Sequence, residues 1–203
     1  RNLDFPSSPG LCGAHCLMAF VPDEPGIQPI LGVSFMGMIG VITAMNPDGV
    51  FVSMNNVSEL VAGGNNDRIP RCLALREALE RARRITALAD LPESLRRHPI
   101  LVGNNILLSR PAARGALAAV LEWDGDSQDN GVTLRSSEER DGAEAIFCTN
   151  HHISRGGQSP EAGSLGRYCA MREEEGRFLT AEKQIGSLQE ARQVLARAAG
   201  AKT

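Results

Sequence analysis

The alternation of apolar and polar positions predicts two groups of short strands separated by helices. The first group is a meander of four apolar runs, at residues 11–21, 30–35, 41–45 and 50–54. Turn formers join them, the strongest being Asn-Pro-Asp-Gly at residues 46–49. The second group gives strand signals at residues 100–108, 116–123, 132–135 and 143–149.

Helical periodicity fills the space between and after the strand groups. Over residues 69–89, apolar side chains recur at spacings of three and four, with charges on the other face. Residues 90–99 contain a second short helix, and two further helical stretches fall at 164–174 and 188–199. Runs of strands and runs of helices predict a layered α+β domain. We expect residues 11–54 and 100–149 to form two stacked antiparallel sheets, with a helix on an outer face.

Composition narrows the class of protein further. A length of 203 residues with 42% hydrophobic content is enough for one domain with one core. The net charge of −3, with dispersed cations, gives no field that would attract nucleic acid. No apolar run approaches the roughly 20 residues of a membrane span. The chain opens with Arg1 rather than Met, so we expect that residues preceding it have been removed. The sequence is compatible with a cytoplasmic protein and with one exported after loss of a leader. It is also compatible with a homo-oligomer.

Four short segments, taken in chain order, point to a chemistry. Residues 1–5 read Arg-Asn-Leu-Asp-Phe, and residues 44–55 form a strand, a turn and a strand that ends in asparagine. Residues 149–151 read Thr-Asn-His, and residues 164–168 read Ser-Leu-Gly-Arg-Tyr. Their order and spacing resemble the choloylglycine hydrolase and penicillin acyltransferase branch of the N-terminal nucleophile (Ntn) hydrolases, over nearly the whole chain. Two features depart from the family pattern: Ala44 stands where the family prefers glycine, and Asn55 is followed by a second asparagine, Asn56.

The resemblance implies a single domain over residues 1–203, with the four-layer αββα sandwich of two stacked antiparallel sheets flanked by helices. It implies hydrolysis of a linear, non-peptide amide, or acyl transfer to an amine, on a small acyl amide or thioester substrate. The nucleophile would be a cysteine exposed by autoproteolytic processing, whose own α-amino group is the general base. That cysteine would precede residue 1, and the last strands would follow residue 203. The family's chemistry implies no metal or organic cofactor.

The resemblance assigns catalytic roles to five residues of this chain. Arg1 would lie beside the thiol and Asp4 would hold the nucleophile's amine, and a structural Arg–Asp salt bridge is the alternative. Asn55, in preference to Asn56, and Asn150 would donate to the oxyanion, where a strand-end asparagine bonding to backbone is the alternative. Arg167 would orient Asp4 or Asn150 from the start of a helix, and a solvated helical arginine is the alternative.

Other cysteines and histidines suggest weaker alternatives. The cysteines, five in number, are spaced irregularly, so reduced and buried thiols are expected rather than a disulfide framework. Cys12 and Cys16 would share a strand face while His15 points away, which argues against a zinc site. Adjacent His151 and His152 point to opposite faces of a strand, so a satisfied loop histidine is the better interpretation. The rival function is a non-catalytic binding module that keeps the pocket without a nucleophile.

Overall fold

A computed structural model describes residues 13–60, 68–100, 102–111, 116–124, 131–136, 146–155 and 162–180. The strands in these residues form one seven-stranded antiparallel sheet in chain order. They are β1 (His15–Phe20), β2 (Ile30–Phe35), β3 (Thr43–Met45), β4 (Phe51–Leu60), β5 (Val102–Pro111), β6 (Ala116–Trp123) and β7 (Val132–Ser136). The helices are α2 (Arg71–Arg81), α3 (Ala87–Arg96) and α5 (Ala162–Thr180).

The turn between β3 and β4 shows how local sequence sets the strand pairing. Asn46 Oδ1 accepts the Val50 N–H at 3.1 Å, and the Gly49 N–H donates to the Asn46 carbonyl at 3.0 Å. Gly49 has a φ of 76°, which glycine adopts without strain. The Asn46 amide also donates to two carbonyls at the end of α2. The turn therefore fixes the register of the hairpin and the position of the helix together.

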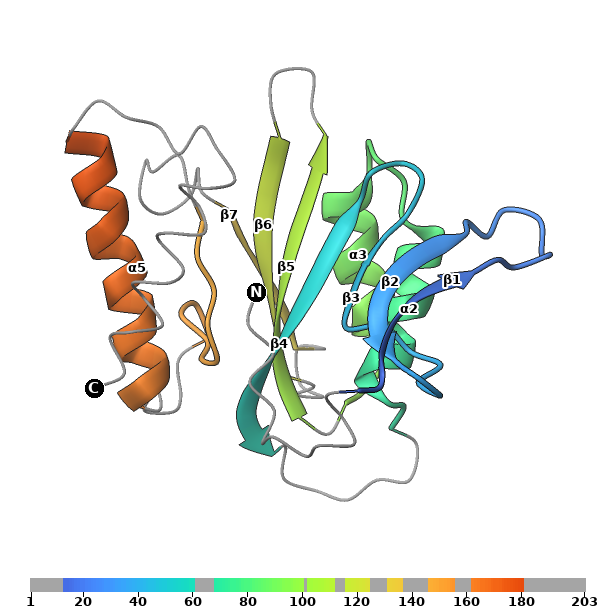
Figure 1. The fold of residues 1–203 in the computed structure, drawn as a ribbon, viewed down its shortest axis with the longest axis horizontal. Coiled ribbons are helices and arrows are strands. Elements are labelled where there is room, and N and C mark those ends of the chain that lie inside the picture. The colour runs from blue at the N-terminus through green and yellow to red at the C-terminus, as the bar shows by residue number, and fades with distance from the viewer. Residues whose placement is uncertain are drawn as a thin grey trace.

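The helices lie on both sides of the sheet (Figure 1). α2 and α3 cover one face, and α5 stands beyond the other face, with residues 146–155 between it and the strands. The main core lies on the α2/α3 side. It consists of alternate strand residues such as Met54, Ile106 and Leu121 packed against buried aliphatic residues of the two helices. Among the described helices, none combines the length and apolar character needed to cross a bilayer.

The predicted α+β class with antiparallel strands is confirmed, and the structure corrects several boundaries. The expected helix over residues 69–89 is wrong, because α2 ends at Arg81 and Ala82 is extended (φ −67°, ψ 133°) before α3 begins. The expected strand over 143–149 is also wrong for its described part, since residues 146–149 lie outside any strand. The helix expected at 188–199 lies outside the described residues.

The assignment of residues 11–54 and 100–149 to separate sheets is wrong. β4 pairs with β5 from Phe51↔Ser109 to Leu60↔Val102, and this ladder joins both strand groups into a single sheet. The ladder shifts register between Asn56 and Leu60, next to the asparagines of the predicted site.

Candidate active site

A row of polar residues crosses the α5 side of the sheet. Asn55 on β4 pairs with Asn105 on β5, which pairs with Glu122 on β6, which pairs with Thr133 on β7. These four residues, the polar row, alternate along the strands with the core residues and so point away from α2 and α3. Asn105 and Glu122 are 1% and 0% exposed. Buried polar groups need partners, and residues 146–155, the crossing segment, supply them.

The first half of the crossing segment bonds to the two asparagines of the row. Asn55 Nδ2 donates to Cys148 Sγ at 3.2 Å and lies 3.5 Å from the Cys148 carbonyl oxygen. Asn105 Nδ2 donates to the carbonyls of Thr149 at 2.9 Å and His151 at 2.6 Å. The two carbonyls that flank residue 150 are thus held by one buried side chain.

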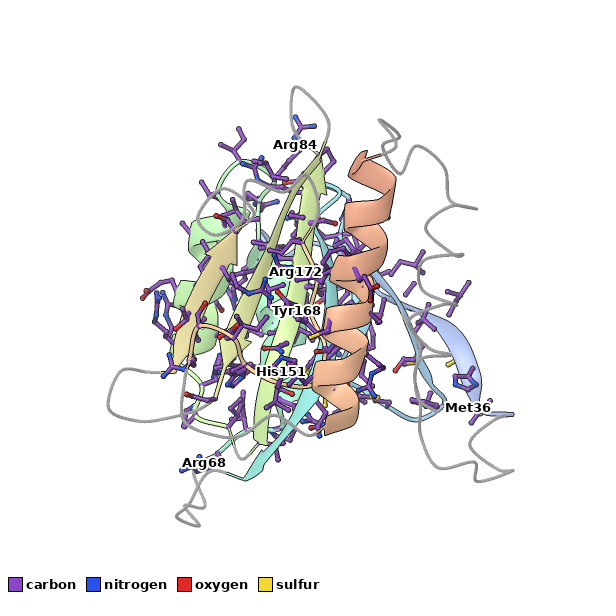
Figure 2. All side chains as sticks on the ribbon, turned by 90° about the vertical axis from the view of Figure 1, so that its left-hand side faces the viewer. Met36, Arg68, Arg84, His151, Tyr168 and Arg172 are labelled. Atoms are coloured by element: carbon purple, nitrogen blue, oxygen red, sulfur yellow. The ribbon has the colours of Figure 1, made fainter. Side chains whose placement is uncertain are left out.

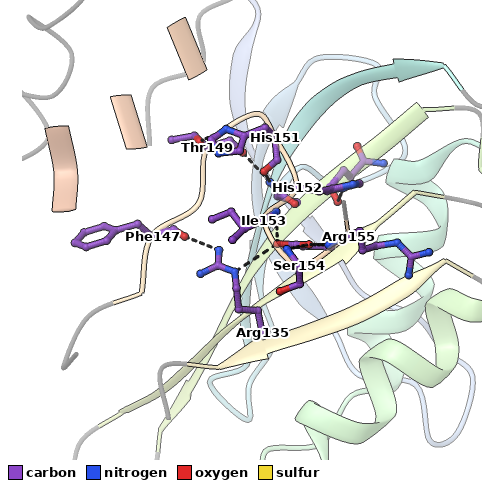
Figure 3. Close-up of polar contacts among 11 residues, drawn as sticks. Arg135, Phe147, Thr149, His151, His152, Ile153, Ser154 and Arg155 are labelled. Atoms are coloured by element: carbon purple, nitrogen blue, oxygen red, sulfur yellow. Dashed lines mark hydrogen bonds and ion pairs between the residues drawn. The ribbon is translucent and has the colours of Figure 1, made fainter. Parts of the chain in front are cut away.

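The second half of the segment, with Ile153, Ser154 and Arg155 labelled in Figure 3, bonds to Glu122. Oε1 accepts the Ile153 N–H at 2.8 Å, and Oε2 accepts the N–H groups of Ser154 and Arg155 at 2.8 and 2.9 Å. Arg135 Nε lies 3.4 Å from Oε1 and forms a buried ion pair with it. The carboxylate thus accepts three backbone N–H groups and has one guanidinium beside it.

The end of the crossing segment also reaches the last member of the polar row. Arg155 Nη1 donates to Thr133 Oγ1 at 2.9 Å, and its Nε pairs with Asp124 Oδ2 at 2.5 Å. Every residue of the polar row therefore contacts the segment, in the order in which the chain passes over the strands.

Asn150, in the middle of the crossing segment, bonds to residues of α5 and of β4. Its backbone N–H donates to Ser164 Oγ at 2.8 Å, and its Nδ2 donates to the Asn56 carbonyl at 2.6 Å. Arg167 Nη2 donates to Asn150 Oδ1 at 2.9 Å. These partners fix which way the amide faces, because a flipped amide would place two donors together at Arg167. The bond to Asn56 uses one of the two Nδ2 hydrogens, and Arg167 polarises the amide that carries both.

His151 is bonded within the same cluster. Its Nδ1 lies 2.8 Å from Ser164 Oγ and 3.1 Å from Thr149 Oγ1. The Tyr168 ring meets the imidazole edge to face, with centroids 5.6 Å apart. Figure 2 shows His151 and Tyr168 where α5 passes over the sheet. The histidine is buried and hydrogen-bonded, as a satisfied loop histidine is.

The surroundings of His151 favour its neutral form. Burial lowers the pKa of His151 below its usual value, because desolvation penalises the charged ring. Glu122 opposes this shift, while the charges of Arg135, His152 and Arg167 add to it. A neutral ring with one acceptor nitrogen suits the two hydroxyls beside it. Ser164 is fully buried and accepts the Asn150 N–H, so it serves as a support and not as an exposed nucleophile.

The structure brings together three of the five predicted site residues. Asn55, Asn150 and Arg167 all lie on the α5 side of the sheet, around the crossing segment. Arg1 and Asp4 lie outside the described residues.

The two neighbouring asparagines on β4 are distinguished by their side chains. Asn55 points to the crossing segment, whereas Asn56 Oδ1 accepts a hydrogen bond from Arg71 Nη1 on α2. The same Nη1 donates to Asn104 Oδ1 at 2.9 Å, and burial lowers the pKa of Arg71. Only the backbone carbonyl of Asn56 reaches Asn150. The side chain that faces the site is therefore that of Asn55.

The expectation of buried cysteines is wrong in its simple form. Cys16, Cys72 and Cys148 are half-buried and Cys169 is exposed, while Cys12 lies outside the described residues. Within the described ranges, no three His, Cys, Asp or Glu side chains are placed to hold a metal ion.

Sequence reasoning gave no role to the residues that support the site, although Ser164 opens one of the four motifs. Glu122 and Asn105 are buried polar residues inside apolar strands, and Ser164 is a buried hydroxyl at the start of α5. The available signal was the placement of an acid and an amide at positions where the neighbouring strand residues are apolar. Without the strand register, nothing in the sequence places them in one row with Asn55.

Comparisons with known proteins identify the fold. The structure resembles the Caenorhabditis elegans ortholog of N-acylethanolamine-hydrolyzing acid amidase, with a TM-score of 0.52 and 16% identity, over 97% of this chain and 79% of that one. It also matches a variant of conjugated bile acid hydrolase from Clostridium perfringens, with a TM-score of 0.48 and 13% identity, over 84% of this chain and 63% of that one. No family model and no curated protein sequence matches the chain. The chain has the α+β fold of the Caenorhabditis elegans acid amidase ortholog.

Proposed function

We propose that the protein cleaves a linear, non-peptide amide, or transfers its acyl group to an amine, with a cysteine nucleophile that precedes Arg1. The observation that supports this most is the meeting of Asn150, Arg167 and Asn55 around one segment, from three parts of the chain that are far apart in sequence. Two side-chain amides on one side of a sheet suit the stabilisation of an oxyanion. The rival, a binding module without a nucleophile, does not need an amide polarised by an arginine.

In the proposed reaction the thiol gives its proton to its own α-amino group and attacks the amide carbon. A free α-amine has a pKa of about 7.7–8.0 and a thiol about 8.5, so this proton transfer costs little. The carbonyl oxygen gains the negative charge, and Asn55 and Asn150 donate to it. The amine leaves with the proton, and water or a second amine resolves the thioester. Arg1 would stabilise the thiolate and Asp4 would hold the α-amine.

The substrate class we propose is an N-acyl amine. The Caenorhabditis elegans neighbour is described as hydrolysing N-acylethanolamines, which are amides of this kind. Analysis of the products with and without an added amine acceptor separates hydrolysis from acyl transfer.

The nucleophile is tested by covalent labelling of the full-length protein with an electrophilic amide analogue, followed by mapping of the modified residue. We expect the label on a cysteine that precedes Arg1, and loss of labelling in Asp4→Asn. Labelling of Cys12 or Cys16 would show a different enzyme class, and labelling of Cys148 would place the nucleophile beside Asn55. If the full-length protein shows no labelling and no turnover, the binding module is supported instead.

A further inference from the structure

We propose that Glu122 is the positioning residue of this site: its carboxylate holds the crossing segment in place and so fixes Asn150. The inference rests on the proposed function for its effect on catalysis, but its structural part stands on contacts alone. Among the described residues, the backbone hydrogen bonds of Glu122 go to residues 153–155 and not to Asn150, so we expect it to act through the segment.

The carboxylate accepts three successive backbone N–H groups, those of Ile153, Ser154 and Arg155. Successive N–H groups that converge in this way form a concave site for an anion. Here the anion is a fully buried side chain of the sheet itself. The turn at residues 153–155 therefore takes its shape from Glu122.

Arg135 extends this effect to the other end of the crossing segment. It forms the ion pair with Glu122 through Nε, and its Nη2 donates to the Phe147 carbonyl at 2.6 Å (Figure 3). The Glu122–Arg135 pair thus holds the segment at residue 147 and at residues 153–155. Asn105 holds the carbonyls of residues 149 and 151 between these two points. Asn150 lies between the two carbonyls that Asn105 holds. Its side chain and its backbone N–H bond to α5 and β4.

The groups that bond to the side chain at position 122 require an acceptor there. The partners of Glu122 in the described part of the chain are three backbone N–H donors and the guanidinium of Arg135, which is an ion-pair partner. A glutamine would turn an NH₂ group toward some of these donors and leave at least one unsatisfied. An aspartate keeps both acceptors but is one methylene shorter, so it reaches only part of the turn.

The test compares Glu122→Gln and Glu122→Asp with the control Trp123→Phe in the full chain. Trp123 is the next residue on β6, is fully buried, and faces the α2/α3 core on the opposite side. It therefore reports a loss of stability that does not involve the crossing segment. Two readouts are needed: residue-by-residue amide hydrogen exchange, and kcat and KM on an N-acyl amine, both well below the melting temperature of every variant.

We expect Glu122→Gln to speed exchange at residues 153–155 and at the Asn150 N–H by about tenfold or more relative to core amides. A displacement of the order of 1 Å can cost about 100-fold in rate, so we expect kcat to fall by about 10- to 100-fold with KM nearly unchanged. Glu122→Asp should be intermediate in both readouts, and Trp123→Phe should change neither. Unchanged exchange at Asn150 in Glu122→Gln, or an equal fall of kcat in Trp123→Phe, would overturn the proposal. If the wild-type protein shows no amidase activity, the exchange result still decides the positioning role, and only the proposed function fails.

Discussion

The two faces of the sheet are built from alternate residues of the same strands. One face packs apolar side chains, and the other makes hydrogen bonds. On the α2/α3 face, residues such as Leu108 and Leu121 are fully buried among aliphatic side chains. On the α5 face, at positions of the same strands that alternate with the core residues, the polar row bonds to the crossing segment. The first face gains stability from burial of apolar area, and the second uses hydrogen bonds that depend on position.

This difference separates stability from function within one sheet. A core position tolerates any apolar side chain of similar volume, at a modest cost. A position in the polar row tolerates only a group with the right donors and acceptors at the right place. Substitutions on the two faces should therefore fall into two classes: those that lower the unfolding free energy alone, and those that lower activity in a protein that stays folded.

The largest expected effect is on the core face. Leu121→Ala removes a fully buried side chain and leaves a cavity, so we expect the free energy of unfolding to fall by about 2–5 kcal/mol. The measurement is denaturant unfolding, combined with kcat per folded molecule. We expect kcat to stay within about twofold, and a large fall in kcat would break the separation of the two faces.

The next effect is on the site face, where two adjacent asparagines provide a matched pair. Asn55→Ala removes one proposed oxyanion donor, and we expect kcat to fall by about 100- to 1,000-fold. Asn56→Ala removes a side chain that points to α2 and keeps the carbonyl that Asn150 uses, so its kcat should change far less. The measurement is kcat of Asn55→Ala and of Asn56→Ala on an N-acyl amine, from steady-state kinetics. The reverse order would show that Asn56 is the functional asparagine.

The smallest expected effect is the pH dependence that His151 contributes. Its pKa is lowered in the folded protein, so the unfolded chain takes up a proton at a higher pH than the folded protein does. The contribution of His151 to the free energy of unfolding is fully present above the usual histidine pKa of about 6.5. It is lost as the pH falls toward the pKa of His151 in the folded protein, by at most about 1.4 kcal/mol per pH unit. Glu122, Arg135, His152 and Arg167 are the charged or titratable groups that affect this shift.

Unfolding measured from pH 7.5 down to pH 5 should show this slope in the wild type and a smaller one in His151→Gln. His15→Gln, on β1 at the edge of the sheet, is the control and should keep the slope. Equal slopes in the wild type and in His151→Gln would remove His151 from this account.

Much of the fold could be predicted because its signals are local. β2 and β6 begin and end where the apolar runs do, and the Asn46–Gly49 turn follows from its residues. The predicted helix over residues 69–89 is interrupted at Ala82, which is extended despite the high helical propensity of alanine. Its carbonyl accepts hydrogen bonds from Gln28 and Asn46, which are distant in sequence and which no local pattern predicts. The prediction of two separate sheets was wrong because the pairing of β4 with β5 is a long-range contact that no local pattern encodes.

The site could be predicted only in part, for the same reason. The motifs were sufficient to select Asn55, Asn150 and Arg167, whose contacts the structure then shows. Their catalytic roles stay predictions. The sequence gave Glu122 and Asn105 no role in the site, because that role comes from the strand register that places them beneath the crossing segment.

The most direct test of the account is the activity of Asn150→Ala beside that of Asn46→Ala. Asn46 is also a buried asparagine with several backbone partners, but it supports the β3–β4 turn and α2 rather than the site. We predict that Asn150→Ala lowers kcat on an N-acyl amine by about 100- to 1,000-fold and leaves unfolding nearly unchanged. Asn46→Ala should lower stability by about 1–3 kcal/mol and leave kcat per folded molecule unchanged. Equal activity in the wild type and in Asn150→Ala would contradict the central claim.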